Sequence, residues 1–323
     1  PRKTELRNYG KEGICMLKTE RMDRVRAALR AQGLTQMIVC DPKSVWYLTG
    51  VAVEPYERLL ALYLPTEGEP VLFLNRLFNV PEPPCRTVWH TDTDKPVAQI
   101  AEVVDAGRPL GIDKEWPAKF LIPLMEAHPG MQVVLSSDCV DDCRACKDAE
   151  EQTLMREASR INDAVNEAAK HYIKAGMTER EVAEFIDAQF RAHGCEGPSF
   201  TTIVSFGANA ADPHHEPDDT VLKEGDCVLF DMGCEKSRYC SDMTRTWFCG
   251  QPTEKQAAVH DLVRRANEAA EALIKPGVRL CELDAAARDL ITEAGYGAYF
   301  NHRLGHFIGQ TDHEKGDVSS ANT

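Results

Sequence analysis

The feature that most constrains the fold is a change of pattern near residue 140. Before it, short apolar runs alternate with stretches of helical periodicity, which is typical of an α/β unit. The apolar runs are MIVC (37–40), LLALYLP (59–65), PVLFL (70–74) and MQVVLS (131–136). From Lys147 a long helical run follows instead, KDAEEQTLMREASRINDAVNEAAKHYI. The change predicts two domains, for which a chain of 323 residues is long enough.

The first domain is expected at residues 16–140 and the second at residues 147–323. Residues 1–15 show no periodicity, and Met16 opens an amphipathic run, so we interpret 1–15 as a non-native leader or read-through. In the second domain Thr178 and Glu181 have the spacing of a capping box at a helix start. Three strand candidates (FTTIVSF, CVLFDMG and YCSDMTRTWF) and helices at about 254–274 and 281–294 follow.

The charge balance argues against nucleic-acid and membrane partners. Thirty-seven Lys and Arg residues against 51 Asp and Glu residues give a net charge of -14, which repels phosphate and anionic lipid. No run approaches the roughly 20 apolar residues that span a bilayer, and the N-terminus lacks the apolar stretch of a secretory signal. We therefore expect a soluble, cytoplasmic protein whose twelve cysteines are reduced.

One cysteine spacing has a functional alternative. Cys139, Cys143 and Cys146 form C-x3-C-x2-C, which resembles the cluster-binding triplet of radical enzymes that use S-adenosylmethionine. The triplet lies in what we interpret as an Asp-rich linker, without the aromatic residue usual before the third cysteine. We favour ordinary thiols, and a colourless protein without iron would exclude the cluster.

Two aspartates are candidates for metal ligation. Asp231 ends an apolar strand (VLFD), and Asp242 follows eleven residues later, beyond a turn-like segment, so a hairpin could bring both carboxylates together. Adjacent carboxylates raise one another's pKa unless a cation or a proton lies between them. Asp231 could instead cap a turn, and Asp242 could pair with Arg245, so these two residues alone leave the question open.

A histidine-rich segment supplies a third candidate. His306 lies between Gly305 and Gly309 in GHFIG, and His302 and His313 flank it. One imidazole with carboxylates is a ligand set that suits Mn, Co, Fe or Zn, and a pair of such ions can activate a water molecule. A second pair, His214 and His215, lies in the polar loop NAADPHHEPDD.

These segments resemble the creatinase/aminopeptidase family of metallopeptidases, and in particular its proline-specific branch, the Xaa-Pro dipeptidases (prolidases) and Xaa-Pro aminopeptidases. The resemblance rests on DPKSVWYLTG, KDAEE, FDMGCEKSRYCSDMTRT and HRLGHFIGQTDHE, in this order. It implies an α/β (α+β) fold in which a creatinase-type N-terminal α/β domain precedes a pita-bread catalytic domain. It also implies a homodimer.

The resemblance assigns roles to single residues. Asp231 would be a ligand of the first metal, Asp242 the bridging ligand, and His306 the imidazole ligand of the second metal. His214 would face the scissile amide, His313 would hold the substrate carbonyl or move a proton, and His302 would line the site. We interpret His215 as an exposed loop histidine and Arg245 as a structural ion-pair partner.

The family's remaining two ligands are glutamates, in segments reading approximately I-E-P-G and V-E-D, and neither segment occurs in residues 1–323. Glu314 belongs to the D-H-E segment itself, and Glu293 lies in a helical run. We therefore interpret the pita-bread domain as C-terminally truncated and expect this fragment to be inactive, with the activity belonging to its full-length parent.

The resemblance implies hydrolysis of Xaa-Pro bonds in proline-containing peptides or dipeptides. A hydroxide bridging two divalent ions would attack the carbonyl, with Mn the first choice and Co, Zn or Fe alternatives. One alternative is a metal-independent amidinohydrolase like creatinase, whose relatives lack the ligand aspartates. Another is a peptide-binding pita-bread module without catalysis, which would typically lose the ligand set. Dipeptidase and aminopeptidase are not distinguished.

Overall fold

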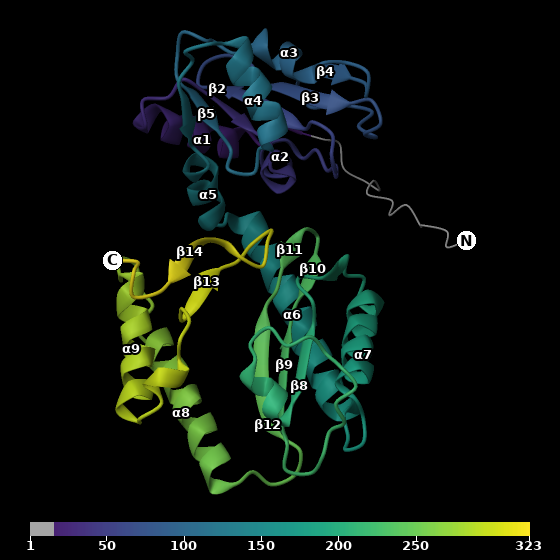
Figure 1. The fold of residues 1–323 in the computed structure, drawn as a ribbon, viewed down its shortest axis with the longest axis vertical. Coiled ribbons are helices and arrows are strands. Elements are labelled where there is room, and N and C mark those ends of the chain that lie inside the picture. Colours follow the sequence, from purple (N-terminus) through teal and green to yellow (C-terminus); the bar gives the residue numbers. More distant parts are fainter. Residues whose placement is uncertain (1–15) are drawn as a thin grey trace, which may run out of the picture. The chain divides into compact units, whose positions relative to one another are not determined.

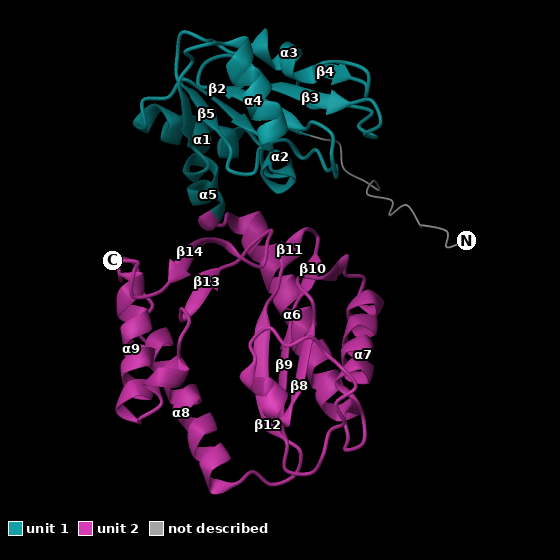
Figure 2. Cartoon of the chain, viewed as in Figure 1, with its two compact units in different colours: residues 1–144 teal, residues 145–323 magenta. Residues whose placement is uncertain are grey.

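The computed structural model describes residues 16–323, which divide between Arg144 and Ala145 into two units with separate cores (Figure 2). The leader expected at residues 1–15 lies outside the described residues. None of the helices in the described part of the chain is long and apolar enough to cross a membrane.

Unit 1 is built on a six-stranded mixed sheet in the order β4-β3-β2-β1-β5-β6 (Figure 1). The strands are β1 (Gln36–Val39), β2 (Ala61–Pro65), β3 (Val71–Asn75), β4 (Arg86–His90), β5 (Leu110–Ile112) and β6 (Val133–Leu135). The helices are α1 (Thr19–Ala31), α2 (Pro42–Thr49), α3 (Pro96–Ala101), α4 (Ala118–Ala127) and α5 (Asp138–Ala145). The alternation of strands and helices is the expected α/β pattern.

The central strand β1 explains why both faces of this sheet are covered. Met37 and Val39 point into a core with residues of α1 and α2, whereas Ile38 points into a second core with Ile100 of α3 and Leu124 of α4. Successive side chains of a strand point to opposite faces, so the apolar run from Met37 to Val39 needs helices on both sides.

The cysteine triplet lies on and just after helix α5, so the interpretation of this stretch as a linker was wrong. Cys139 and Cys143 are four residues apart, share one helix face and are buried in the core of unit 1. Burial raises the pKa of the Cys139 thiol to about 11, which keeps it protonated at neutral pH. Among residues 16–323, no cluster with metal-ligand spacing contains a cysteine.

Unit 2 begins with two helices that cover one face of a three-stranded antiparallel sheet, β12-β9-β8 (Figure 1). The elements are α6 (Ala149–Tyr172), α7 (Glu179–Ala192), β8 (Ile203–Phe206), β9 (Cys227–Met232) and β12 (Met243–Phe248). Thr178 and Glu181 form the predicted capping box of α7. Ile186 and Phe190 of α7 pack against Phe206 and Phe230 of the sheet.

A short three-stranded sheet, β11-β10-β7, interrupts the connection between β9 and β12. Its strands are β7 (Gly197–Pro198), β10 (Cys234–Lys236) and β11 (Tyr239–Cys240). The strand predicted over YCSDMTRTWF is therefore two strands, because the chain leaves β11 at Cys240 and enters β12 only at Met243.

The remaining elements of unit 2 are a helix pair and a hairpin. They are α8 (Glu254–Glu271), α9 (Leu280–Glu293), β13 (Gly305–Phe307) and β14 (Glu314–Val318), with short 3-10 helices η1 (Gly207–Ala211) and η2 (Gly297–Tyr299). Alanines at the contact (Ala266, Ala270 and Ala287) let α8 and α9 approach closely. Figure 1 shows this second half facing the β8-β9-β12 sheet.

Candidate metal centre

The two candidate aspartates are brought together by the pairing of β9 with β12. Thr244 lies opposite Asp231 and Met243 opposite Met232, so Asp242, one residue before β12, lies beside the end of β9. The Thr244 hydroxyl donates a hydrogen bond of 2.7 Å to Asp231 Oδ1. Burial, and next the Asp231 carboxylate, raise the pKa of Asp242 to about 6. The pair therefore behaves as a site that lacks a positive charge.

His306 of β13 supplies an imidazole to the same place. Its Nε2 lies 3.4 Å from Asp242 Oδ2, and the two side chains are 20% and 25% exposed, respectively. Its Nδ1 lies 3.1 Å from the carbonyl oxygen of Phe307. In the tautomer whose Nδ1–H donates to that carbonyl, Nε2 presents its lone pair to Asp242. Two acceptors facing one another at this distance suit a shared cation.

The spacing of the three candidates fits a pair of ions better than a single ion. Within residues 16–323, only Glu179, His215 and Asp218 have ligand atoms that all lie within 4.8 Å of one another. At least one pair of ligand atoms among Asp231, Asp242 and His306 is therefore farther apart. Paired catalytic ions lie about 3.5–4 Å apart, so ligands at opposite ends need not meet. The oxygen and imidazole donors suit Mn, Co, Zn or Fe.

Two of the predicted histidines lie close to this centre. The rings of His306 and His313 have centroids 4.0 Å apart and are inclined by 58°. Burial, and next His306, lower the pKa of His313 below its usual value, so its imidazole is neutral at neutral pH. His302 is exposed, and its Nδ1 lies 2.6 Å from the carbonyl oxygen of Arg303.

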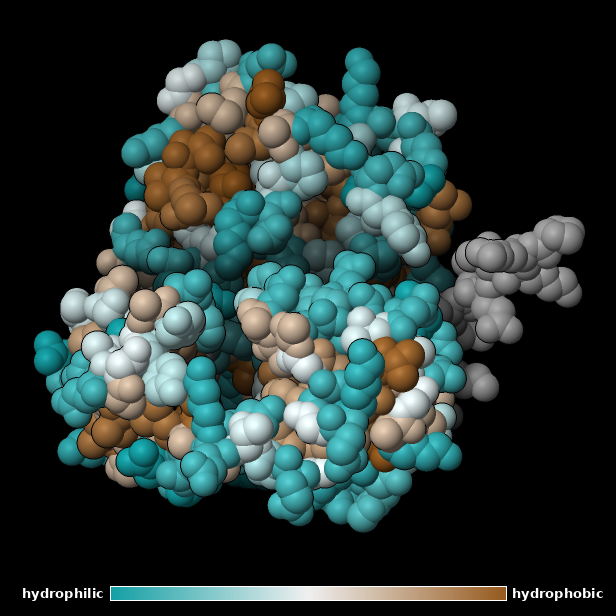
Figure 3. All heavy atoms as spheres, turned by 60° about the horizontal axis from the view of Figure 1, so that its bottom comes forward, coloured by the Kyte–Doolittle hydropathy of each residue, from teal (hydrophilic) through white to brown (hydrophobic). Residues whose placement is uncertain are grey.

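A cavity of about 760 Å³ lies beside Asp242, between the sheet side and the helix-pair side of unit 2. Asp242, His302 and His306 contribute to its wall, and much of the remaining surface is apolar. The apolar residues include Val263, Ile291, Phe300, Leu304 and Ile308. Figure 3 shows unit 2 hollowed between its two halves. A small peptide could enter such a space.

The structure does not place His214 in the wall of this cavity. His214 is exposed in the loop after η1, and its backbone N–H donates 3.0 Å to Asp212 Oδ1. Its assignment to the scissile amide therefore stays a prediction that rests on the family resemblance.

Two structural interpretations from the sequence need correction. Arg245 lines the cavity and donates to the carbonyl of its neighbour Thr244 at 2.8 Å, and it makes no ion pair with any described residue. His215 is only 15% exposed, because its Nε2 lies 2.7 Å from the buried carboxylate of Glu179. Sequence reasoning missed Glu179, whose only local signal is its place after the capping residue Thr178.

Gly233 leaves room for the backbone that carries Asp242. A Cβ at Gly233 would lie 1.9 Å from the carbonyl oxygen of Ser241 and 2.2 Å from Ser199 Oγ. We therefore expect Gly233→Ala to destabilise unit 2 by about 3 kcal/mol, the upper range for overpacking. Gly197→Ala is the matched control, because its Cβ would meet nothing within 4 Å. Thermal denaturation of both variants measures the difference, and equal stabilities would contradict the close approach.

Family models match both units of the chain. Residues 153–323 match metallopeptidase family M24, and residues 21–146 match the creatinase/prolidase N-terminal domain. An uncharacterized peptidase from Staphylococcus epidermidis is 34% identical over 302 residues, which are 92% of this chain and 86% of that protein. An uncharacterized peptidase from Staphylococcus saprophyticus is 36% identical over 312 residues, 94% of this chain and 87% of the relative.

Solved structures of three peptidases are similar over nearly the whole chain. A prolidase from Thermococcus sibiricus has a TM-score of 0.88 at 30% identity, covering 97% of this chain and 86% of that one. Dipeptidase PepE from Mycobacterium ulcerans has a TM-score of 0.86 at 32% identity, covering 94% and 84%. An Xaa-Pro dipeptidase from Bacillus anthracis has a TM-score of 0.84 at 27% identity, covering 94% and 85%.

Proposed function

Because this chain belongs to metallopeptidase family M24, we propose that the protein carrying it hydrolyses Xaa-Pro bonds with two divalent cations held around Asp242. The observation that supports this most is the position of Asp242. Its carboxylate lies beside Asp231 and 3.4 Å from His306 Nε2. The Asp242 carboxylate thus lies between two other groups that can accept hydrogen bonds or bind a metal, in the wall of a cavity large enough for a peptide. Such a group of acceptors binds a cation better than it binds an apolar or neutral ligand.

The chain's own residues take the following parts in the proposal. Asp231, Asp242 and His306 would together hold the two cations. Mn is the first choice, with Co, Zn or Fe as alternatives. Bound cations would polarise the scissile carbonyl and acidify a water molecule. The family resemblance also implies two glutamate ligands, in segments that do not occur in residues 1–323, so the activity is proposed for the protein that carries this chain together with those ligands.

Histidines next to the cations handle protons and orient the substrate. His313 is neutral at neutral pH because of burial and the nearby His306, so it can accept a proton or, protonated, donate one to the departing amine. His302 lines the cavity and is exposed. His214 approaches the scissile amide through its loop.

Selectivity for proline follows from the bond that is cleaved. The nitrogen of an Xaa-Pro bond belongs to the proline ring and carries no N–H. A site that offers no acceptor at this position leaves the N–H of an ordinary peptide bond unpaired, and so favours proline. Phe300, Leu304 and Ile308 give the cavity an apolar wall for the pyrrolidine ring. The similar solved structures, which include a prolidase and an Xaa-Pro dipeptidase, support dipeptides as the first substrates to test.

The full-length protein with Mn is expected to cleave a dipeptide ending in proline with at least about tenfold higher kcat/KM than the matched dipeptide ending in alanine. Chelation should abolish the cleavage, and added Mn should restore it. If the protein hydrolyses creatine and this activity survives chelation, the protein is a metal-independent amidinohydrolase and the present proposal is wrong. If the protein binds peptides but hydrolyses none of them with any of the metals tested, it is a peptide-binding module and not a peptidase.

A further inference from the structure

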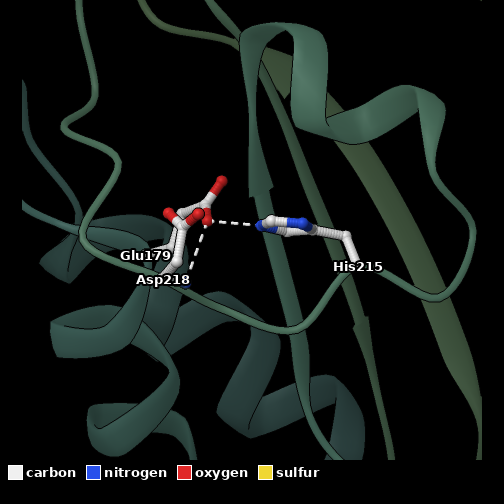
Figure 4. Close-up of side chains that lie close together, drawn as sticks. All are labelled: Glu179, His215 and Asp218. Carbon is white, nitrogen blue, oxygen red and sulfur yellow. Dashed lines mark hydrogen bonds and ion pairs between the residues drawn. The ribbon is translucent and has the colours of Figure 1, made fainter.

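The loop that carries His214 is tied to one buried carboxylate. Residues 207–217, the His214 loop, connect the end of β8 to the segment that pairs with the start of α7. Glu179, the first residue of α7, has a side chain that is fully buried, and it points at His215 (Figure 4). The carboxylate therefore lies under the loop rather than in solvent.

Four donors from this part of the chain converge on the Glu179 carboxylate. Oε1 accepts from the backbone N–H of Phe206 at 2.7 Å and from Asn209 Nδ2 at 3.0 Å. Oε2 accepts from His215 Nε2 at 2.7 Å and from the backbone N–H of Asp218 at 3.2 Å. Two of these donors flank the His214 loop at its ends, and two lie within it. One side chain thus fixes both ends and the interior of the loop.

This cluster is a hydrogen-bonded anchor, not a second metal site, although its ligand atoms have metal-like spacing. Each Glu179 oxygen already accepts two hydrogen bonds. A cation would have to displace the backbone N–H donors of Phe206 and Asp218 from this carboxylate. N–H donors at a helix N-terminus are suitable partners for a carboxylate.

His214 depends on this anchor for its position. Within the described part of the chain its imidazole makes no hydrogen bond, and only its backbone N–H is bonded, to Asp212. The adjacent residue His215 is fixed to Glu179. On the α7 side, the backbone N–H groups of Glu179 and Arg180 donate to the carbonyls of Thr220 and Asp218. The backbone on both sides of His214 is therefore held by hydrogen bonds, whereas its imidazole makes none with the described residues.

We propose that Glu179 is a positioning residue for peptide hydrolysis, which sets His214 toward the substrate through the hydrogen bonds to His215 and to the loop ends. The catalytic part of this inference rests on the proposed function, in which His214 faces the scissile amide. The anchoring part concerns the loop alone and can be measured without substrate. An experiment can therefore show whether the anchoring part or the catalytic part of the inference has failed.

Anchoring is tested by hydrogen exchange on Glu179→Gln, whose amide group cannot accept at both ends. In the full-length protein we expect the N–H groups of Phe206 and Asp218 to exchange at least about tenfold faster. Amides in the middle of α7 should keep their rates, which shows that the helix is folded. Glu184→Gln, an exposed change on the same helix, is the matched control. Unchanged exchange at Phe206 and Asp218 overturns the anchor.

Positioning is tested by kinetics on His215, where folding is less at risk. His215→Gln keeps a donor for Glu179, whereas His215→Leu does not. We expect His215→Leu to lower kcat for a proline dipeptide about 100-fold, as for a misplaced group, with KM and Mn affinity within about twofold. His215→Gln should recover at least a tenth of the wild-type kcat. Equal kcat in both variants and wild type, or parallel loss of Mn affinity, overturns positioning.

The two measurements also separate this inference from the function on which it rests. A wild-type protein that cleaves no Xaa-Pro peptide would remove the proposed function and the positioning role together. Faster exchange at Phe206 and Asp218 in Glu179→Gln would then still establish the anchor.

Discussion

Asp242→Asn is expected to remove divalent metal binding and peptide hydrolysis together. Asp242 is the one candidate ligand that lies beside both Asp231 and His306, so its loss weakens both cation positions. Substitutions outside the ligand shell already lower metal affinity 10- to 100-fold. We expect Mn affinity to fall at least about 100-fold and kcat/KM at least about 1,000-fold, or about 4 kcal/mol. Calorimetric titration with Mn and peptidase assays on the full-length protein measure these losses.

The metal-free protein should respond in the opposite direction. Burial and Asp231 raise the pKa of Asp242 to about 6, so above that pH the folded state carries a carboxylate it disfavours. A neutral asparagine removes this cost, and we expect metal-free Asp242→Asn to be more stable at pH 7.5 by about 1 kcal/mol, allowing for solvent screening. A residue that served only to hold the fold would lose stability when changed.

Asp289→Asn controls for the change of charge, because Asp289 is exposed on α9. Its Mn affinity and its thermal stability should equal those of the wild type. Wild-type Mn affinity in Asp242→Asn would remove Asp242 from the ligand set, whatever happened to activity.

Local patterns predicted much of this fold because they act over a few residues. Interactions between residues a few positions apart determine the apolar strands of unit 1 and the helices α8 and α9. They also determine the capping box of Thr178 and Glu181. The α/β fold with a creatinase-type domain before a pita-bread domain is confirmed by the structure and by the similar prolidases. The proximity of Asp231 and Asp242 was also predictable, since a hairpin-like return needs no distant partner.

Contacts between distant residues were not predictable in this way. Glu179 and His215 are 36 residues apart, and Lys147 and Glu314 are 167 residues apart. The Lys147 ammonium lies 3.0 Å from Glu314 Oε2, and both side chains are largely buried. Periodicity carries no information on which charged residue will meet which, because that depends on how whole elements pack.

The extra hairpin of β10 and β11 was missed for a different reason. Ser237 and Arg238 both adopt positive φ, 50° and 67°. A two-residue hairpin turn of this kind usually contains Asn-Gly or Asp-Gly. Serine and arginine give no such signal, so the sequence indicated a turn but not the extra hairpin.

Asp284→Asn is expected to loosen α9 from the segment that leads to His306. The Asp284 carboxylate, fully buried, accepts from Arg288 Nε at 2.7 Å and Nη2 at 2.8 Å. It also accepts from the backbone N–H of Leu304 at 3.2 Å. Arg288 in turn donates to the carbonyls of Phe300 and His302 at 2.7 Å each. We expect the free energy of unfolding to fall by about 3 kcal/mol, since Arg288 loses its counter-charge.

The same ion pair gives this loss a defined pH dependence. Hydrogen bonding from Arg288 holds the pKa of Asp284 below its usual value, which is about 3.9 in unfolded chains. A lowered pKa in the folded state stabilises the protein fully above pH 4 to 5. That stabilisation is lost as the pH falls through the lowered value. Urea denaturation followed by circular dichroism should therefore separate wild type from Asp284→Asn widely at pH 7 and much less at pH 3.

Glu282→Gln on the same helix is the control for this experiment. Glu282 pairs with Arg279 at 2.7 Å, but the side chains are 46% and 62% exposed. Exposed pairs contribute about 0.2–1 kcal/mol, so this variant should differ little from wild type at either pH. A difference between wild type and Asp284→Asn that stays constant from pH 7 to pH 3 would show that the charge on Asp284 does not stabilise the fold. The contact of α9 with the His306 segment would then depend on apolar packing around Ala287 alone.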